Sequence, residues 1–258
     1  MESGIVKQAF KLGNSAGVLL PIEWKGRRVS VKLIERSISQ DIIEILEERG
    51  LLKNTLGIFL TGSYARGEET GESDIDLLIV TDNINKQIKI DKYEIVLISK
   101  ESLDKSIISG LYMVSSINEA KAIMNNELLQ SYKGKIKLSW VKKHIAEIKS
   151  IVKINEIAIN SYEEMKGNVS DETLYSVILR LRELYIIECL RNKKNYSSKE
   201  FISLVRKVAN EESYNAYVRV KNDRKTKKVI SCNDAMALIE ETKKRVVSIE
   251  KWQKELKG

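Results

Sequence analysis

Histidine, cysteine and proline are nearly absent from this sequence. Its 258 residues include one histidine, two cysteines and one proline. A single histidine excludes metal sites built from several histidines, and it leaves little for Ser-His-Asp chemistry. Cys189 and Cys232 have no second cysteine or histidine nearby in the sequence. We therefore expect two reduced thiols in a cytoplasmic protein, and no zinc site.

Long apolar runs are also missing. The longest fall well short of the ~20 residues that cross a membrane. The first ten residues, MESGIVKQAF, do not place a basic segment before an apolar one, so we expect neither a membrane span nor a secretory signal. Charge is abundant, with 44 Lys and Arg against 36 Asp and Glu, a net charge of +8. This excess favours a polyanion or a phosphate-bearing substrate, although many Lys and Glu together are also common in proteins from hot environments.

The pattern of the chain changes twice along its length, which predicts an α+β fold with three parts. Residues 1–36 alternate short apolar segments with turns and predict a small β-hairpin domain, in which Pro21 marks an edge or a strand end. Residues 37–135 mix helical and strand patterns. Residues 136–258 keep a helical spacing and predict a bundle of about four helices.

Within the middle part, individual elements can be assigned from their patterns. Apolar spacing and turn residues predict helices at 39–48, 102–113 and 119–129, and strands at 56–61, 75–80 and 92–99. In the last part, Ser197 precedes Glu200 by three residues, as in a capping box, and Ser231 with Asp234 is expected to begin the final helix.

The strongest chemical signal is GSYARGEETGESDIDLLIV, residues 62–80. A predicted strand ends at Gly62 and Ser63, and a helical start follows. Backbone N–H groups at a helix start, together with the helix dipole, favour the binding of phosphate. Gly62 has no Cβ and lets a ligand approach the backbone, and Arg66 adds a positive charge one turn later.

Three acidic residues that follow the Gly-Ser turn in the sequence are candidate metal ligands. Asp74 and Asp76 are two positions apart on the predicted strand, so their side chains share a face. Two neighbouring carboxylates repel each other unless a cation lies between them, and their oxygens suit Mg²⁺ or Mn²⁺. Glu94 on the next strand is a candidate third ligand. The three carboxylates would hold two metal ions roughly 3.5–4 Å apart, as in enzymes that catalyse in-line displacement at phosphorus.

Together these residues resemble the hallmark of the nucleotidyltransferase superfamily of DNA polymerase β type, most closely its small prokaryotic and archaeal members. That hallmark is a Gly-Ser pair, a spacer, and an acidic-apolar-acidic triplet on a strand, here Gly62, Ser63, Asp74 and Asp76. The family usually has Asp where this chain has Glu94, so one metal position is altered or lost here. The resemblance covers roughly residues 38–130.

The resemblance implies a fold and an activity. The fold is a mixed sheet with flanking helices. The activity is metal-dependent transfer of a nucleoside monophosphate from a nucleoside triphosphate, with ATP as the expected donor, to an acceptor hydroxyl, with release of pyrophosphate. Mg²⁺ or Mn²⁺ would be the cofactor. Asp74, Asp76 and Glu94 would be catalytic residues and metal ligands, and Gly62, Ser63 and Arg66 would bind the nucleotide.

The two flanking parts carry weaker resemblances. KLGNSAGVLLPIEWKGRRVSVKLI, residues 11–34, is similar to the AbrB-type swapped-hairpin domain, which implies a homodimer and DNA binding, although a hairpin packed on the catalytic domain is the alternative. The candidate DNA contacts are Lys7, Lys11, Lys25, Arg27 and Arg28.

The helical part resembles the accessory bundle that helps such enzymes bind the acceptor or the nucleotide base. Arg180, Arg182 and Glu183 would face the cleft, although a solvated helix face is the favoured interpretation. The basic loop 218–228 would contact a triphosphate or a nucleic acid, or be a solvated loop. For the whole chain, the alternative to an enzyme is a DNA-binding or antitoxin-like regulatory module with a ligand-sensing or inactive nucleotidyltransferase fold.

Overall fold

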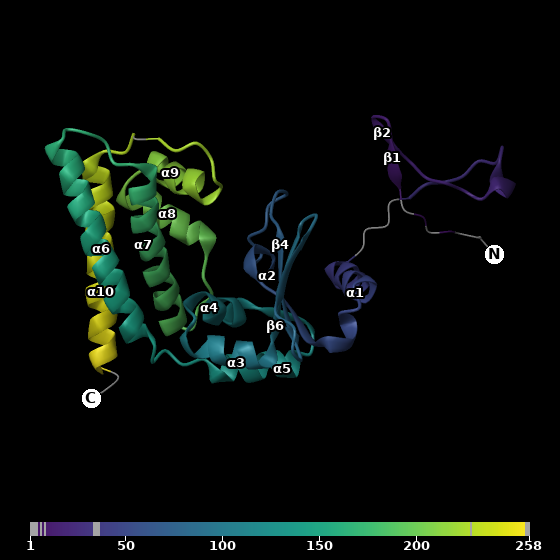
Figure 1. Cartoon of the computed structure of the whole chain (residues 1–258), viewed down its shortest axis with the longest axis horizontal. Coiled ribbons are helices and arrows are strands. Elements are labelled where there is room, and N and C mark those ends of the chain that lie inside the picture. The colour runs from purple at the N-terminus through teal and green to yellow at the C-terminus, as the bar shows by residue number, and fades with distance from the viewer. Residues whose placement is uncertain (1–4, 6, 8, 33–36, 228, 256–258) are drawn as a thin grey trace. The chain divides into compact units, whose positions relative to one another are not determined.

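We describe a computed structural model of the chain, which covers residues 5, 7, 9–32, 37–227 and 229–255. The chain forms two compact units, residues 1–44 and 45–258 (Figure 1). The domain boundaries predicted after residues 36 and 135 stay predictions. No helix in the described ranges has both the length and the apolar character of a membrane span.

The first unit contains a short antiparallel hairpin, β1 (Phe10–Leu12) and β2 (Ser15–Gly17). Its turn is formed as the sequence predicts, with Gly13 at a φ of 59° and the Ser15 hydroxyl donating to the carbonyl of Leu12 at 3.0 Å. The later apolar segment is a 3-10 helix, η1 (Ile22–Trp24), and not the predicted strand, because Pro21 caps that helix.

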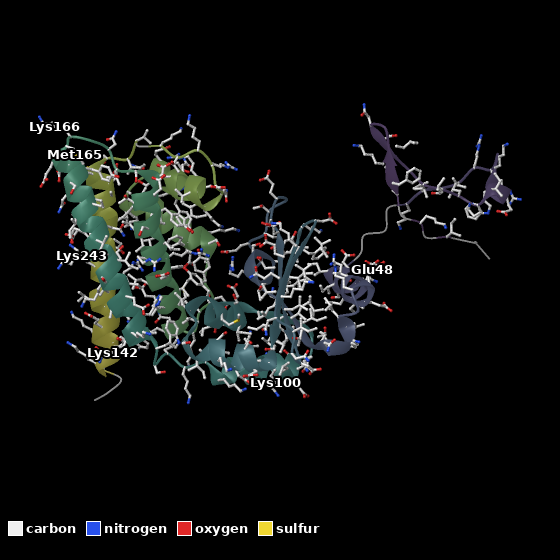
Figure 2. All side chains as sticks on the ribbon, viewed as in Figure 1. Glu48, Lys100, Lys142, Met165, Lys166 and Lys243 are labelled. Atoms are coloured by element: carbon white, nitrogen blue, oxygen red, sulfur yellow. The ribbon has the colours of Figure 1, made fainter. Side chains whose placement is uncertain are left out.

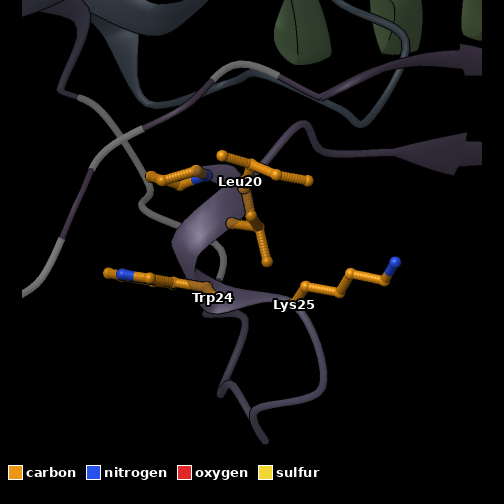
Figure 3. Close-up of a pocket in the computed structure, with 5 residues that line it drawn as sticks. Leu20, Trp24 and Lys25 are labelled. Carbon is orange, nitrogen blue, oxygen red and sulfur yellow. The ribbon is translucent and has the colours of Figure 1, made fainter.

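The last apolar segment of the predicted hairpin domain, VSVKLI at residues 29–34, was expected to be a strand, but residues 29–32 form none, and residues 33 and 34 lie outside the described part of the chain. No described residue between positions 5 and 32 is buried. The apolar side chains around η1 leave a shallow hollow of about 200 Å³ (Figure 3). Its lining residues are Leu20, Pro21, Ile22, Trp24 and Lys25.

The second unit is organised around a mixed sheet, which has the strand order β5-β6-β4-β3-β7 within the described residues. The strands are β3 (Thr55–Leu60), β4 (Ile75–Thr81), β5 (Lys86–Ile90), β6 (Tyr93–Ser99) and β7 (Lys121–Met124). Strands β4 and β6 pair in parallel, and the other pairs are antiparallel. The central strand β4 has the sequence IDLLIVT and is buried along nearly its whole length, which explains why its apolar residues do not alternate.

Five α-helices lie between residues 38 and 135, and their bounds correct two predictions. They are α1 (Ile38–Glu48), α2 (Gly62–Arg66), α3 (Lys100–Ser109), α4 (Leu111–Glu119) and α5 (Asn126–Lys135). The helix predicted at 102–113 is interrupted at Gly110, which has an extended conformation. The helix predicted at 119–129 is wrong at its start, because residues 121–124 pair with β3 as an edge strand and the helix begins only at Asn126.

The C-terminal helices form a bundle, as the helical spacing predicts. They are α6 (Val141–Glu164), α7 (Asp171–Arg191), α8 (Ser198–Val208), α9 (Glu211–Lys221) and α10 (Cys232–Glu255). Helices α6 and α10 pack against each other (Figure 1). Lys243 of α10, labelled in Figure 2, forms an ion pair of 2.6 Å with Glu156 of α6. The predicted caps are present, since the hydroxyls of Ser197 and Ser231 accept from the third residue of their helices.

Candidate active site

The Gly-Ser turn lies at the end of β3, where the chain passes into the short helix α2. Gly62 has a φ of +65°, a conformation that favours glycine. A Cβ built on Gly62 would lie 1.8 Å from Oδ2 of Asp76, so the carboxylate of Asp76 is packed directly on this glycine. The backbone N–H of Thr61 also donates to the carbonyl of Asp76 at 2.9 Å. The turn and one of the predicted metal ligands therefore meet at a single point.

The three predicted carboxylates come from adjacent places in the sheet. Asp76 lies in β4, and Glu94 is its direct partner in the parallel register with β6. Asp74 precedes β4, which begins at Ile75, so the prediction that both aspartates lie on one strand is wrong for Asp74. The side chains of Asp74 and Glu94 are 47% and 44% exposed, which leaves both carboxylates open to a ligand.

The pKa of Asp76 is shifted by burial and by the charged groups around it. Burial raises the pKa of Asp76 above its usual value, and the charges of Glu94 and Asp74 raise it further. The positive charges of Arg66 and Lys221 work in the opposite direction. A cation at this place would relieve a repulsion that is already present.

A lysine that the sequence analysis did not consider contacts two of these acids. Lys89 lies on β5 opposite Glu94, and its Nζ is 2.5 Å from Oε1 of Glu94 and 3.7 Å from Oδ2 of Asp74. Both carboxylates raise the pKa of Lys89, with Glu94 contributing most. The signal in the sequence was weak, because a five-residue edge strand with the sequence KQIKI does not stand out from a polar loop.

The arrangement fits a divalent ion in its chemistry but is not a closed cage. In the described part of the chain, no three His, Cys, Asp or Glu side chains gather into a group that could hold a metal ion. Mg²⁺, however, is commonly held by one or two carboxylates together with phosphate oxygens of a substrate. Asp74 and Asp76 supply two such carboxylates beside the Gly62 turn, so the residues fit an ion that is shared with a phosphate ligand.

Arg66 is held from several sides. Its Nη1 donates to both carboxylate oxygens of Glu119 at 2.9 Å, its Nε donates to Glu68 at 3.0 Å, and its Nη2 donates to Ser198 at 3.2 Å. Glu119 also accepts from the backbone N–H of Gly62 at 3.1 Å. The structure thus links Arg66 to the turn through Glu119, and the direct nucleotide contact predicted for Arg66 stays a prediction.

Glu119 is a site residue that sequence reasoning missed. It lies at the end of α4, is buried, and is separated from Gly62 by 57 positions in the sequence. Burial raises the pKa of Glu119 above its usual value, although the Arg66 guanidinium opposes this shift. No local motif marks this residue, because its role depends on a tertiary contact.

Glu68 connects the turn to the helical bundle. Its carboxylate accepts from the Ser197 hydroxyl at 2.6 Å and from the Ser198 backbone N–H at 2.9 Å, at the N-terminus of α8. Burial works to raise the pKa of Glu68, but the hydrogen bonds from Ser197, Ser198 and Arg66 outweigh it and lower that pKa to about 2. Glu68 is therefore ionised at neutral pH, where its charge also favours the start of α8.

The bundle contributes arginines close to this network. The guanidiniums of Arg66 and Arg182 both stack on the ring of Tyr196, at 5.3 Å and 5.2 Å from its centroid. Glu183 is only 3% exposed and accepts from Arg180 at 2.9 Å. The interpretation of this helix segment as a solvated face is therefore wrong for Glu183.

The C-terminal end of α9 also acts on the carboxylates. Lys221 is the last residue of α9, and its charge works to lower the pKa of Asp76. The beginning of the basic segment 218–228 is thereby placed within electrostatic range of the Gly62 turn. The contacts predicted for the rest of this segment stay predictions.

Comparison with known proteins gives one family match and two similar solved structures. The family model described as "Nucleotidyltransferase domain" matches residues 39–203. No curated protein sequence matches the chain at a significant level. Two crystal structures are similar at 13% identity: a nucleotidyltransferase-like protein from Exiguobacterium sibiricum 255-15, and spectinomycin adenyltransferase from Enterococcus faecialis with ATP and spectinomycin. Their TM-scores are 0.39 and 0.41, the matches cover 82% and 81% of this chain, and they cover 75% and 98% of the other chains.

Proposed function

The protein is an enzyme of the nucleotidyltransferase family, and we propose that it transfers a nucleoside monophosphate from a nucleoside triphosphate to an acceptor hydroxyl. ATP is the expected donor, and pyrophosphate is the expected leaving group. One observation carries this proposal. The carboxylate of Asp76 lies against Gly62 so closely that any Cβ at position 62 would collide with it. This closeness supports the proposal, because the acid proposed to bind the metal ion lies beside the turn proposed to bind the phosphates, where one ion could contact both.

The turn would hold the triphosphate tail. Ser63 lies in the first turn of α2 and is half-buried, and its hydroxyl would donate to a phosphate oxygen. Backbone N–H groups at the start of α2, other than that of Gly62, which donates to Glu119, would bind the same phosphates. Arg66 would add positive charge from behind the turn, where Glu119 and Glu68 hold it in place.

Asp74 and Asp76 would hold Mg²⁺ or Mn²⁺, with Glu94 as a further ligand or as the base. When bound, the ion supplies a Lewis acid that neutralises charge on the phosphates. In the reaction, the acceptor oxygen forms a bond to the α-phosphorus while the bond from that phosphorus to the bridging oxygen breaks, and pyrophosphate leaves. Glu94, which is 44% exposed, would take the proton of the acceptor hydroxyl.

Binding of a non-hydrolysable ATP analogue tests the proposal without knowledge of the acceptor. We expect calorimetry to detect binding of the analogue to the wild type in the presence of Mg²⁺. Asp76→Asn should weaken this binding at least about tenfold, because it removes one contact between a charged carboxylate and the metal ion. Asp82→Asn is the matched control, because Asp82 is an exposed acid just beyond the other end of β4. Two results together would contradict the proposal. The double variant Asp74→Ala with Asp76→Ala would bind the ATP analogue as tightly as the wild type, and the wild type would release no pyrophosphate from any triphosphate.

A second proposal concerns the first unit, which would form a homodimer and bind DNA. It is supported by the absence of any buried residue in the described part of segment 5–32. The basic residues Lys7, Lys11, Lys25, Arg27 and Arg28 are all exposed there. DNA affinity that falls with salt and disappears when Lys25, Arg27 and Arg28 are replaced by Gln would support it, whereas negligible and salt-independent affinity would contradict it.

A further inference from the structure

We propose that Lys89 is an internal competitor of the catalytic metal ion, which keeps the affinity for the free ion low until a nucleotide binds. Its ammonium group contacts Glu94 and Asp74, two of the carboxylates proposed as ligands of the ion. The proposal rests on the proposed function, because it assumes that a divalent cation binds at these acids. It adds a residue and a coupling that the proposed reaction does not itself require.

The sheet register places Lys89 at the acids. Lys89 of β5 is the direct antiparallel partner of Glu94 in β6, and Glu94 is the direct parallel partner of Asp76 in β4. Directly opposed side chains lie on the same face of a sheet and are close enough to interact. The pairing of three strands therefore aligns Lys89, Glu94 and Asp76 in one row across the sheet.

Lys89 differs from the other cations near the site. Within the described residues, Lys89 forms the ion pairs with Glu94 and Asp74, whereas Lys221 acts on Asp76 through its charge at longer range. Lys86 on the same strand lies opposite Leu97 and, being three positions away, is on the other face of the sheet. The contact is therefore specific to one lysine of the strand.

Lys89 is also able to leave. Its side chain is 63% exposed, and a lysine ammonium on its flexible four-carbon stem can turn into water at little cost. A divalent ion that binds without a nucleotide must displace this ammonium group or be repelled by its positive charge at short range. A triphosphate brings negative charge of its own, so it gives Lys89 a new partner as the ion takes its place. Metal and nucleotide should therefore increase each other's affinity to the same extent.

Manganese binding to the full chain without nucleotide tests this inference. We would titrate Mn²⁺ and measure the free ion by electron paramagnetic resonance for the wild type, Lys89→Met and the matched control Lys86→Met. The neutral side chain at position 89 should tighten Mn²⁺ binding on the order of tenfold at low salt, because one repelling charge is removed. Lys86→Met should stay within about twofold of the wild type, and the effect of Lys89→Met should shrink as salt is added.

Repeating the titration with a non-hydrolysable ATP analogue should reduce the gap between the wild type and Lys89→Met. A second variant, Lys89→Gln, repeats the measurement. The inference is overturned if either variant binds Mn²⁺ no more tightly than the wild type, or if neither variant binds it at all. Asp76→Asn separates this failure from that of the proposed function. If Asp76→Asn binds Mn²⁺ as the wild type does, the metal site itself is misplaced. If it does not, while the Lys89 variants match the wild type, only the role of Lys89 is wrong.

Discussion

At the scale of single residues, two glycines with nearly the same backbone conformation have different surroundings. Gly62 and Gly67 have φ values of +65° and +70° and lie at the start and just past the end of α2. A Cβ at Gly62 would lie 1.8 Å from Oδ2 of Asp76, whereas a Cβ at Gly67 would meet nothing within 4 Å. Substitutions at these two glycines therefore distinguish the effect of backbone strain from the effect of displacing Asp76.

We predict that Gly67→Ala costs about 1 kcal/mol of stability, from the strained backbone alone, and retains nucleotide binding. Gly62→Ala should carry the same strain and also displace the Asp76 carboxylate, so that binding of an ATP analogue falls below detection. Thermal melting and calorimetry on both variants check this. Retained nucleotide affinity in Gly62→Ala would show that Asp76 does not act beside the turn.

The residues that the structure brings together in the candidate site divide into those that a local pattern reveals and those that it does not. Gly62, Ser63 and Asp76 were predictable because turn chemistry and strand alternation are properties of a short stretch of sequence. Glu119 and Lys89 were not, because each reaches the site only through a tertiary contact, one from the end of α4 and one from an edge strand.

At the scale of elements, the contact between Glu68 and the start of α8 is the one with the clearest dependence on pH. The carboxylate accepts hydrogen bonds from Ser197 and Ser198, and the pKa of Glu68 is lowered to about 2 from an ordinary value of 4.5. A group with a lowered folded-state pKa stabilises the fold above its unfolded pKa, and this contribution is lost as the pH falls through the folded value.

We therefore predict that Glu68→Gln lowers the free energy of unfolding by about 1–2 kcal/mol at pH 7, the usual range for a lost cap. The difference from the wild type should shrink as the pH falls from about 4.5 towards 2, because the wild-type carboxylate becomes protonated there. Urea unfolding at a series of pH values measures it. Glu69→Gln, a change of the neighbouring exposed acid, is the control and should show little effect. A gap that stays constant down to pH 2 would contradict the assigned ion pair.

The elements also show where sequence patterns are sufficient. The strands β3, β4 and β6 are long and apolar, so they were predicted close to their true bounds. The edge strands β5 and β7 were missed, because each is short and is stabilised by pairing with a neighbour and not by its own pattern. The break at Gly110 was missed for a similar reason, since the apolar spacing continues through it.

At the scale of the whole molecule, the two units contrast in how they bury apolar side chains. The second unit has a continuous core that runs from the sheet into the bundle. In the first unit, four large apolar residues among those described between positions 5 and 32 are exposed to 60% or more, namely Leu12, Leu19, Ile22 and Val31. A hairpin of two three-residue strands is too small to be stable by itself in water. The observation favours a second copy of the chain as the partner that covers these side chains.

We accordingly predict that the full chain is a dimer and that replacing Leu19 and Ile22 together by Ser converts it to a monomer. Both side chains are about three-quarters exposed, at 74% and 76%, so the change removes apolar contact area between copies without opening a core. The melting temperature of the second unit should not change. Sedimentation equilibrium over a range of concentrations measures the conversion. Ile154→Ser, a substitution of a 63% exposed residue on α6, is the matched control and should leave the dimer intact. A wild-type chain that sediments as a monomer at every concentration would contradict this assignment, because the apolar surface of the first unit would then have no second copy to cover it.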